Sequence, residues 1–143
     1  MKTNFSFIKH FFFITIFLFS FTLFSQEIKM EKEELAKVLC KNWRINMMFV
    51  NGEEMLLSES FLHTGGMEFK TDYTYLEKPV TENTVKGNWN YNEEKHCVEL
   101  FMENKFIGTI KSVNAEKLVY LPFLDEDAKK LIKSSEMYLS PAN

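Results

Sequence analysis

Arginine is almost absent from this chain of 143 residues, since Arg44 is the only one. The sequence therefore argues against a site that clamps phosphates or several carboxylates with guanidinium groups. Lysine and arginine together number 17 against 20 aspartates and glutamates, which gives a formal net charge of −3. Nucleic-acid binding needs a basic footprint, so this acidic balance predicts no nucleic-acid partner.

The common catalytic and metal-binding motifs are also missing. The chain has no nucleotide-binding glycine loop, zinc-protease pair, nucleophile elbow or Cys-x-x-Cys motif. A metal site at His63 and His96 would need two further ligands, such as Glu59 or Glu99. The spacing of these residues gives no support to such a site. We therefore expect no enzymatic activity, no catalytic residue, no metal and no cofactor.

Cysteine is scarce as well, and its two occurrences are Cys40 and Cys97. A disulfide between them is chemically allowed outside the cytoplasm. Two buried free thiols are the alternative, because free cysteine is often a small core residue. The sequence does not place the two Cα atoms within the roughly 4.4–6.8 Å that a disulfide needs. Both alternatives stay open at this point.

The amino terminus has the features of a secretory signal peptide. Lys2 and Lys9 precede an apolar run, residues 11–24, that is shorter than the ~20 apolar residues of a membrane span. We expect residues 1–25 to be removed by cleavage after Ser25, with an uncleaved anchor as the alternative. The predicted location is secreted or periplasmic, without stable membrane insertion after cleavage.

A short helix is predicted directly after the signal peptide, over residues 26–40. Leu35, Val38 and Leu39 recur there at spacings of three and four residues among charged side chains. A helix of this length persists only if it docks its apolar stripe on the rest of the protein.

From Trp43 onward the hydrophobic period changes to two. Trp43, Ile45, Met47 and Phe49 fall on one face of a predicted strand. Similar short strands follow, separated by turn signals every eight to twelve residues. Residues 41–141 are therefore predicted to form one all-β domain, an antiparallel up-and-down β-barrel of about eight strands, because closure removes both sheet edges. A two-sheet sandwich is the alternative.

The stretch "GNWNYNEE" illustrates the pattern. Gly87, Trp89 and Tyr91 share one face, which we expect to turn inward, and asparagines occupy the other face. A glycine on the inner face leaves room for a neighbouring side chain or strand that crosses closely. The acidic residues after Tyr91 mark a turn into the next strand.

Several short segments resemble the small lipocalin-like domains exported by Bacteroidetes-type bacteria. They are "LCKNWRI", "FKTDYTY", "KGNWNYNEE", "VELF", "IGTIKSVNAEKLVYL" and "EMYLSP", and they span roughly residues 39–141. The resemblance implies a calyx-shaped β-barrel with an inner cavity. One hairpin departs from the family pattern, because Asp72 is followed by Tyr73 instead of the usual glycine. Tyrosine resists the positive φ that such a turn requires.

Eight side chains are candidates for lining the cavity: Trp43, Met47, Phe69, Tyr73, Tyr75, Trp89, Tyr91 and Leu100. Core packing is their alternative role, because aromatic residues dominate protein cores. An eight-stranded barrel is just wide enough to be filled by side chains or to hold one small ligand.

The predicted function is non-covalent binding of a small apolar or amphipathic molecule inside the barrel of a monomer. His63 or Tyr73 would orient the molecule at the mouth. The alternative is a filled barrel that serves as a protein-interaction or envelope-associated module. A continuous interior volume above ~300 Å³ favours the first function, and a solidly packed core favours the second.

Overall fold

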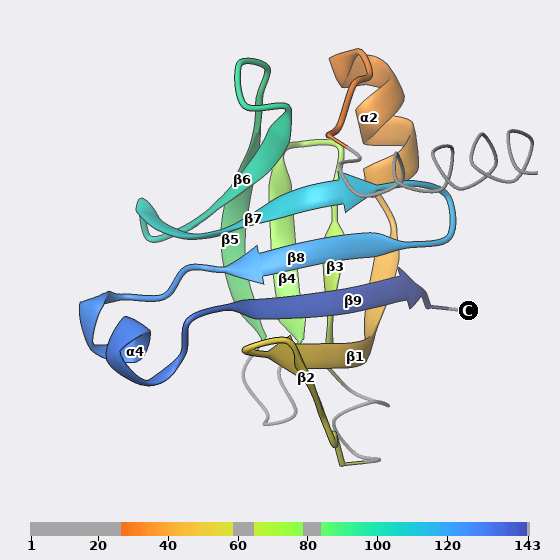
Figure 1. Cartoon of the computed structure of the whole chain (residues 1–143). Helices are drawn as coiled ribbons and strands as arrows, with labels where there is room; N and C mark the ends of the chain where they lie inside the picture. Colours follow the sequence, from red (N-terminus) through yellow and green to blue (C-terminus); the bar gives the residue numbers. More distant parts are fainter. Residues whose placement is uncertain (1–26, 59–64, 79–83, 143) are drawn as a thin grey trace, which may run out of the picture.

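A computed structural model of the chain describes residues 27–58, 65–78 and 84–142 (Figure 1). The predicted signal peptide and His63 lie outside this part. No helix within the described ranges is long and apolar enough to cross a membrane. The elements are, in order, α2 (Lys32–Leu39), β1 (Asn42–Val50), β2 (Glu53–Met55), β3 (Gly66–Phe69), β4 (Thr74–Lys78), β5 (Val85–Asn92), β6 (Cys97–Met102), β7 (Lys105–Val113), β8 (Leu118–Pro122), α4 (Glu126–Leu131) and β9 (Ser135–Pro141).

The strands form a closed antiparallel barrel. Strands β3 to β8 each pair with the next strand in the sequence, and β9 pairs with β1 to close the ring. Eight strands make the ring, and β2 is an extra strand that pairs with the last three residues of β1. The first three residues of β1 pair with β3 along the same edge. The predicted up-and-down barrel with a short amino-terminal helix is confirmed.

A β-bulge in β1 overturns part of the predicted inner face. The pairing of β1 with β9 shifts between Ile45 and Met47. After the shift Met48 lies opposite Met137, which packs against the core, whereas Met47 is 36% exposed. The prediction that Met47 and Phe49 continue the inner face is therefore wrong. One inserted residue reverses the side on which every later side chain of the strand points.

The amino-terminal helix is shorter than predicted and is preceded by an extended segment. Residues 27–31 cross the β5–β6 hairpin, where the Ile28 amide donates to the His96 carbonyl (2.9 Å). The Ile28 carbonyl accepts a hydrogen bond from Tyr91 Oη (2.7 Å). Helix α2 then lies at one end of the barrel (Figure 1) and buries Leu35 and Leu39 completely. We refer to this end as the α2 end and to the opposite one as the distal end.

Both tryptophans are buried inside the barrel, as predicted, and both lie at its α2 end. Trp43 and Trp89 are each 2% exposed. The Trp43 indole donates to the carbonyl of Leu39 at the end of α2 (2.9 Å), and the Trp89 indole donates to the carbonyl of Lys70 in the β3–β4 turn (3.1 Å). The polar edge of each indole is thus satisfied by backbone, so both rings can be fully buried.

The β3–β4 turn adopts the conformation that its sequence disfavours. Tyr73 has φ of +63°. Its carbonyl accepts from the Trp89 amide (2.9 Å), its ring lies 4.9 Å from the Trp89 ring, and Lys32 Nζ lies 4.4 Å from its centroid. Asp72 Oδ1 accepts from the Thr74 amide (3.0 Å) and hydroxyl (2.6 Å). Contacts with β5 and α2 thus stabilise a backbone conformation that costs a bulky residue about 1–2 kcal/mol.

Candidate functional site

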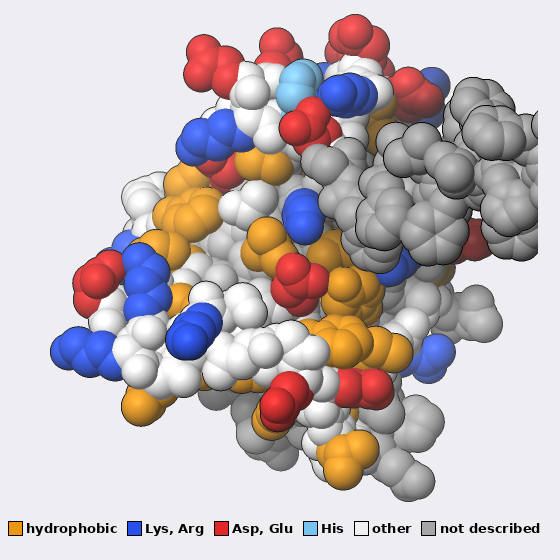
Figure 2. Space-filling model, in the orientation of Figure 1, with side chains coloured by type: hydrophobic (Ala, Val, Ile, Leu, Met, Phe, Trp, Pro, Cys, Tyr) orange, Lys and Arg blue, Asp and Glu red, His pale blue; other side chains and the backbone are white. Residues whose placement is uncertain are grey.

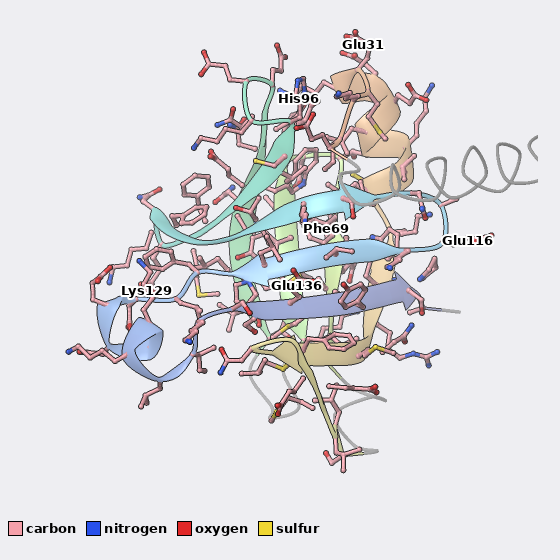
Figure 3. The ribbon with its side chains drawn as sticks, viewed as in Figure 1. Glu31, Phe69, His96, Glu116, Lys129 and Glu136 are labelled. Atoms are coloured by element: carbon pink, nitrogen blue, oxygen red, sulfur yellow. The ribbon has the colours of Figure 1, made fainter. Side chains whose placement is uncertain are left out.

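The eight predicted cavity residues lie in three different places. Five belong to the buried core of the barrel: Trp43, Phe69, Tyr75, Trp89 and Leu100. Figure 3 shows Phe69 within the ring, behind β7 and β8. Met47 and Tyr73 are on the outer surface, 36% and 43% exposed, and Tyr91 lines a groove beside α2. A cavity-lining role for the five core residues stays a prediction.

Tyr75 lies across the inner surface of the neighbouring strand. Its ring occupies the space that a side chain on Gly87 of β5 would need. Its hydroxyl reaches past β5 and donates to the carbonyl of Phe101 on β6 (3.4 Å). The glycine noted in the sequence therefore provides room for a tyrosine ring, as its position on the inner face predicts.

Tyr120 of β8 makes a similar contact with a glycine of its neighbouring strand, β7. Its ring lies against Gly108 of β7, where an added Cβ would be 2.5 Å from the ring carbon Cε2. Its hydroxyl donates to the carbonyl of Ile107 (2.9 Å). The two phenols thus approach the β6–β7 pair, whose register shifts between Leu100 and Phe101. Each tyrosine ring packs over a glycine of the neighbouring strand. The Tyr75 hydroxyl donates to the strand beyond that glycine, whereas the Tyr120 hydroxyl donates to the residue beside its glycine.

Glu77 points into the barrel from the end of β4. It follows the fully buried Tyr75 by two residues and lies opposite Met67, which is 3% exposed. It also interacts electrostatically with Tyr120 on β8. Strands β4 and β8 are not neighbours in the ring, so this interaction crosses the interior. We call Tyr75, Glu77 and Tyr120 the inner polar cluster.

Burial shifts the acidity of all three members of the inner polar cluster. Burial raises the pKa of the Glu77 carboxyl above its ordinary value. Burial, and then the charge of Glu77, raise the pKa of Tyr75 to about 12. The pKa of Tyr120 is raised further, first by burial and then by Glu77 and Tyr75. The tyrosines therefore remain protonated over the physiological range, and Glu77 is the group in the cluster that carries charge.

Glu77 has no positive partner within residues 27–58, 65–78 and 84–142. The ion pairs found there involve other residues. The adjacent Lys78 pairs with Glu68 (3.2 Å), and Lys86 is exposed opposite Leu76. The sequence of residues 59–64 and 79–83, which lie outside the described part, contains no lysine or arginine. The interior thus holds a partly exposed carboxylate that no lysine or arginine of the described chain neutralises.

Ser135 adds a second unpartnered polar group to the inner face. It opens β9 and alternates with Met137 and Leu139, which belong to or pack on the core. The residue is 7% exposed, and its hydroxyl has no hydrogen-bond partner among the described residues. Buried hydroxyls are normally paired, so an unpaired one is a notable exception.

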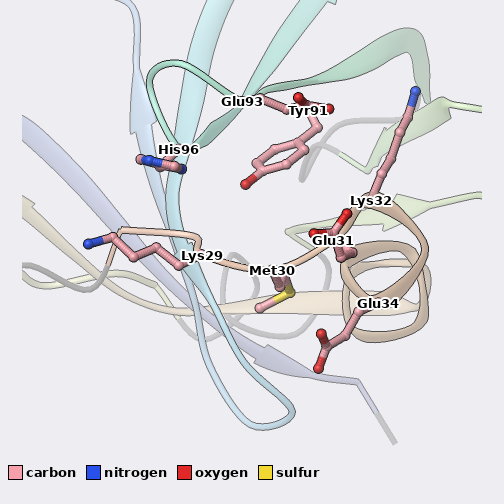
Figure 4. A pocket seen from close by; sticks show the side chains of 8 residues that line it. All are labelled: Lys29, Met30, Glu31, Lys32, Glu34, Tyr91, Glu93 and His96. Atoms are coloured by element: carbon pink, nitrogen blue, oxygen red, sulfur yellow. The ribbon is translucent and has the colours of Figure 1, made fainter.

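A groove of about 520 Å³ lies outside the barrel, between α2 and the β5–β6 hairpin (Figure 4). Its lining residues are Lys29, Met30, Glu31, Lys32, Glu34, Tyr91, Glu93 and His96. Acidic side chains gather at this end of the molecule (Figure 2), and most of the charged ones here are exposed to solvent. The Tyr91 hydroxyl already bonds to Ile28. The groove therefore lacks the apolar lining of a typical small-molecule site.

Two smaller hollows also lie on the outer surface. One of about 190 Å³ is lined by residues that include Phe49 and Tyr138, and one of about 260 Å³ lies between residues 27–30 and the end of β7. No group of three or more metal-ligating side chains occurs in the described part of the chain. Among the described features, the inner polar cluster combines burial, apolar surroundings and an unpaired charge.

Both cysteines are free thiols in the structure. Cys97 is buried at the start of β6, and Cys40 is partly buried after the end of α2. Burial raises the pKa of each thiol, with Asp72 contributing at Cys40 and Glu99 at Cys97. A raised pKa lowers the thiolate fraction, so neither thiol has the properties of a reactive cysteine.

Glu77 and Tyr120 are absent from the residues predicted as a site, although the sequence holds a signal for one of them. Alternation from Tyr73 and Tyr75 places Glu77 on the same face as the aromatic rings. Its approach to Tyr120 depends on barrel closure, for which no local pattern exists.

Comparison with known proteins identifies no relative: no family model, curated protein or solved structure matches this chain.

Proposed function

We propose that this protein is an exported lipocalin-like binding protein that holds one small amphipathic molecule in the distal half of its barrel. The observation that carries the proposal is the inner polar cluster. Small-molecule sites are mostly apolar and contain a few convergent polar groups that fix the ligand's orientation. Glu77 provides such a group between Tyr75 and Tyr120, next to the buried Met67.

The arrangement of the core supports the distal half as the binding region. Leu35 and Leu39 of α2 pack with Trp43 and Trp89 at the other end of the barrel. An apolar ligand portion would contact the inner side chains of the distal half, and its burial would contribute roughly 25 cal/mol per Å² of apolar surface.

Export and kinship with the lipocalin-like domains are parts of this proposal. The basic start and short apolar run of residues 1–25 support removal of a signal peptide and a secreted or periplasmic location. The closed eight-stranded antiparallel barrel is compatible with a lipocalin-like domain.

A filled barrel that acts as a protein-interaction module is the second candidate. The observation in its favour is the bulk of the buried side chains, since Trp43, Phe69, Tyr75 and Trp89 are each no more than 2% exposed. If the distal half is filled in the same way, no ligand enters.

A matched pair of tryptophan substitutions separates the two functions. Val85 faces Glu77 across the β4–β5 pair on the inner side, and Lys86 is exposed on the outer side. We expect a neutral naphthyl fluorophore to bind the native protein at a ratio of one to one. The Val85→Trp variant should lose this binding, and the Lys86→Trp variant should keep it, with folding checked by circular dichroism.

Energy transfer from the native tryptophans to the bound fluorophore gives a second measurement that needs no variant. Trp43 and Trp89 lie inside the ring, so a fluorophore in the distal half should quench their emission and saturate at one equivalent. Absence of saturable binding in both measurements would favour the filled barrel. Native mass spectrometry of protein from its own host would then identify the retained molecule, if binding is found.

A further inference from the structure

We infer that the polar end of the ligand is a cation, an organic ammonium group that pairs with Glu77 inside the barrel. The inference rests on the proposed function and adds the chemical class of the ligand.

The inner polar cluster presents an acceptor to a ligand. The hydroxyl hydrogens of Tyr75 and Tyr120 are already donated to the carbonyls of Phe101 and Ile107. What remains for a ligand is the partly exposed carboxylate of Glu77, because Tyr75 is 0% and Tyr120 5% exposed and both rings pack on glycines. An ammonium group supplies only donors, so its chemistry complements this carboxylate.

The charges around Glu77 point to the same class. On its own strand the flanking Lys78 pairs with Glu68 of β3, and on β5 the closest lysine, Lys86, is exposed opposite Leu76. The inner-face neighbours in these strands are Met67 and Val85, which carry no charge. An anionic ligand would be repelled, and a purely apolar ligand would leave a desolvated carboxylate without a partner, which is costly. An ammonium group removes that cost.

Ser135 is an independent observation in favour of a polar ligand end. Its hydroxyl is buried and unpartnered on the inner face of β9, beside β8, which carries Tyr120. A hydroxyl that rotates freely can accept a hydrogen bond from a second ammonium or amide donor of the ligand.

The inference also fixes the direction of the pH dependence. Among the described residues, the titratable groups that face Glu77 are Tyr75 and Tyr120, and both ionise only at high pH. Affinity for an ammonium ligand should therefore rise with pH as Glu77 ionises, and it should fall again once the amine itself loses its proton.

The test uses one dansyl fluorophore with three alkyl tails of equal length, which end in a primary amine, an alcohol or a carboxylate. We expect the native protein to bind the amine probe at least about tenfold more tightly than the alcohol, and the carboxylate least. The Glu77→Gln variant should bind amine and alcohol equally. The control Glu68→Gln removes a carboxylate of the outer face and should keep the selectivity.

The outcomes separate the two proposals. If the alcohol and carboxylate probes bind as well as the amine, or if Glu77→Gln keeps the amine selectivity, the inference is wrong and the proposed function stands. If no probe binds, the proposed function itself fails. Should Glu77→Gln not fold, the ratio of amine to alcohol affinity of the native protein is measured while the pH is lowered below 4. A ratio that stays constant there overturns the inference.

Discussion

The ring of Tyr75 lies against the backbone of Gly87, its register partner on the next strand, so closely that no side chain fits at position 87. This contact links β4 to β5 and lets the Tyr75 hydroxyl reach β6. The geometry of the inner polar cluster therefore depends on the absence of a side chain at Gly87, which leaves space for the Tyr75 ring.

Substitution of Gly87 should test this dependence. Gly87→Ala places a methyl group within the Tyr75 ring, and we expect a loss of about 1–3 kcal/mol in the free energy of unfolding, the usual cost of overpacking. Asn88→Ala, on the outer face of the same strand, is the control and should change little. The double variant Gly87→Ala with Tyr75→Leu should recover part of the loss. If urea denaturation gives additive effects instead, the two residues do not interact as described.

The bulge in β1 predicts opposite effects at two adjacent methionines. Met47→Asp introduces a charge on the outer surface, so we expect a change within about 0.5 kcal/mol. Met48→Asp introduces one opposite Met137, on the side of the core, and should lower the free energy of unfolding by about 2 kcal/mol or more. Thermal denaturation of the two variants compares them directly. The reverse ranking would show that β1 continues its alternation without a bulge.

Glu77 should make the protein less stable as the pH rises. Its folded pKa is raised, so between the unfolded value of about 4.3 and the folded value the native state binds more protons than the unfolded state. The free energy of unfolding therefore falls across this window and stays lower above it. Glu77→Gln should remove this loss, so the variant should be more stable than the native protein at neutral pH and should show no such gain at low pH, where the carboxyl is protonated in both states. Equal stability of both proteins at neutral pH would contradict the burial of this carboxylate.

Tyrosine ionisation tests the raised pKa of the two phenols in the inner polar cluster, and it needs no ligand. The chain contains five tyrosines. The pKa of Tyr75 is raised to about 12 by burial and by Glu77, and that of Tyr120 is raised beyond it. Absorbance at high pH should therefore show two phenols that ionise after the others, and Tyr75→Phe and Tyr120→Phe should each remove one. In denaturant all five should ionise near 10. Five equivalent phenols in the native protein would contradict this arrangement.

The thiols should be free and slow to react. Without reductant, we expect the unfolded protein to release two equivalents of thiol on reaction with a disulfide reagent. The native protein should react far more slowly, because Cys97 is buried and the pKa of both thiols is raised. A protein mass two units below that of the reduced chain, with no reactive thiol after unfolding, would instead establish a disulfide between Cys40 and Cys97.

Local patterns in the sequence were sufficient for the strands of the barrel and for the inward position of both indoles, but not for the short extra strand β2. Alternation of side chains has a fixed period, and Trp43 and Trp89 occupy clear positions in it. The bulge could not be predicted, because Met47 and Met48 are both apolar and fit either face. The conformation of Tyr73 was also hidden, since its stabilising partners Trp89 and Lys32 are distant in the sequence.

The candidate site was less accessible to prediction than the fold. Glu77 stands on the same face as Tyr75, but a charged residue near a strand end is usually solvated, so the pattern alone favours the surface. Its interaction with Tyr120 joins two strands that are far apart in the ring. Only closure of the barrel brings them to the same interior, and closure is a property of the whole chain.

The two ends of the described chain have a practical consequence for experiments on whole cells or sensor chips. Ile28 is fixed to the β5–β6 hairpin, and the amide of Ala142 donates to the carbonyl of Asn42 (2.9 Å), so both ends leave the barrel beside α2. A linker fused before Glu27 or after Ala142 would therefore anchor the molecule by its helix-covered base. Glu77 would then lie on the side turned toward the surrounding liquid, from which a small molecule arrives.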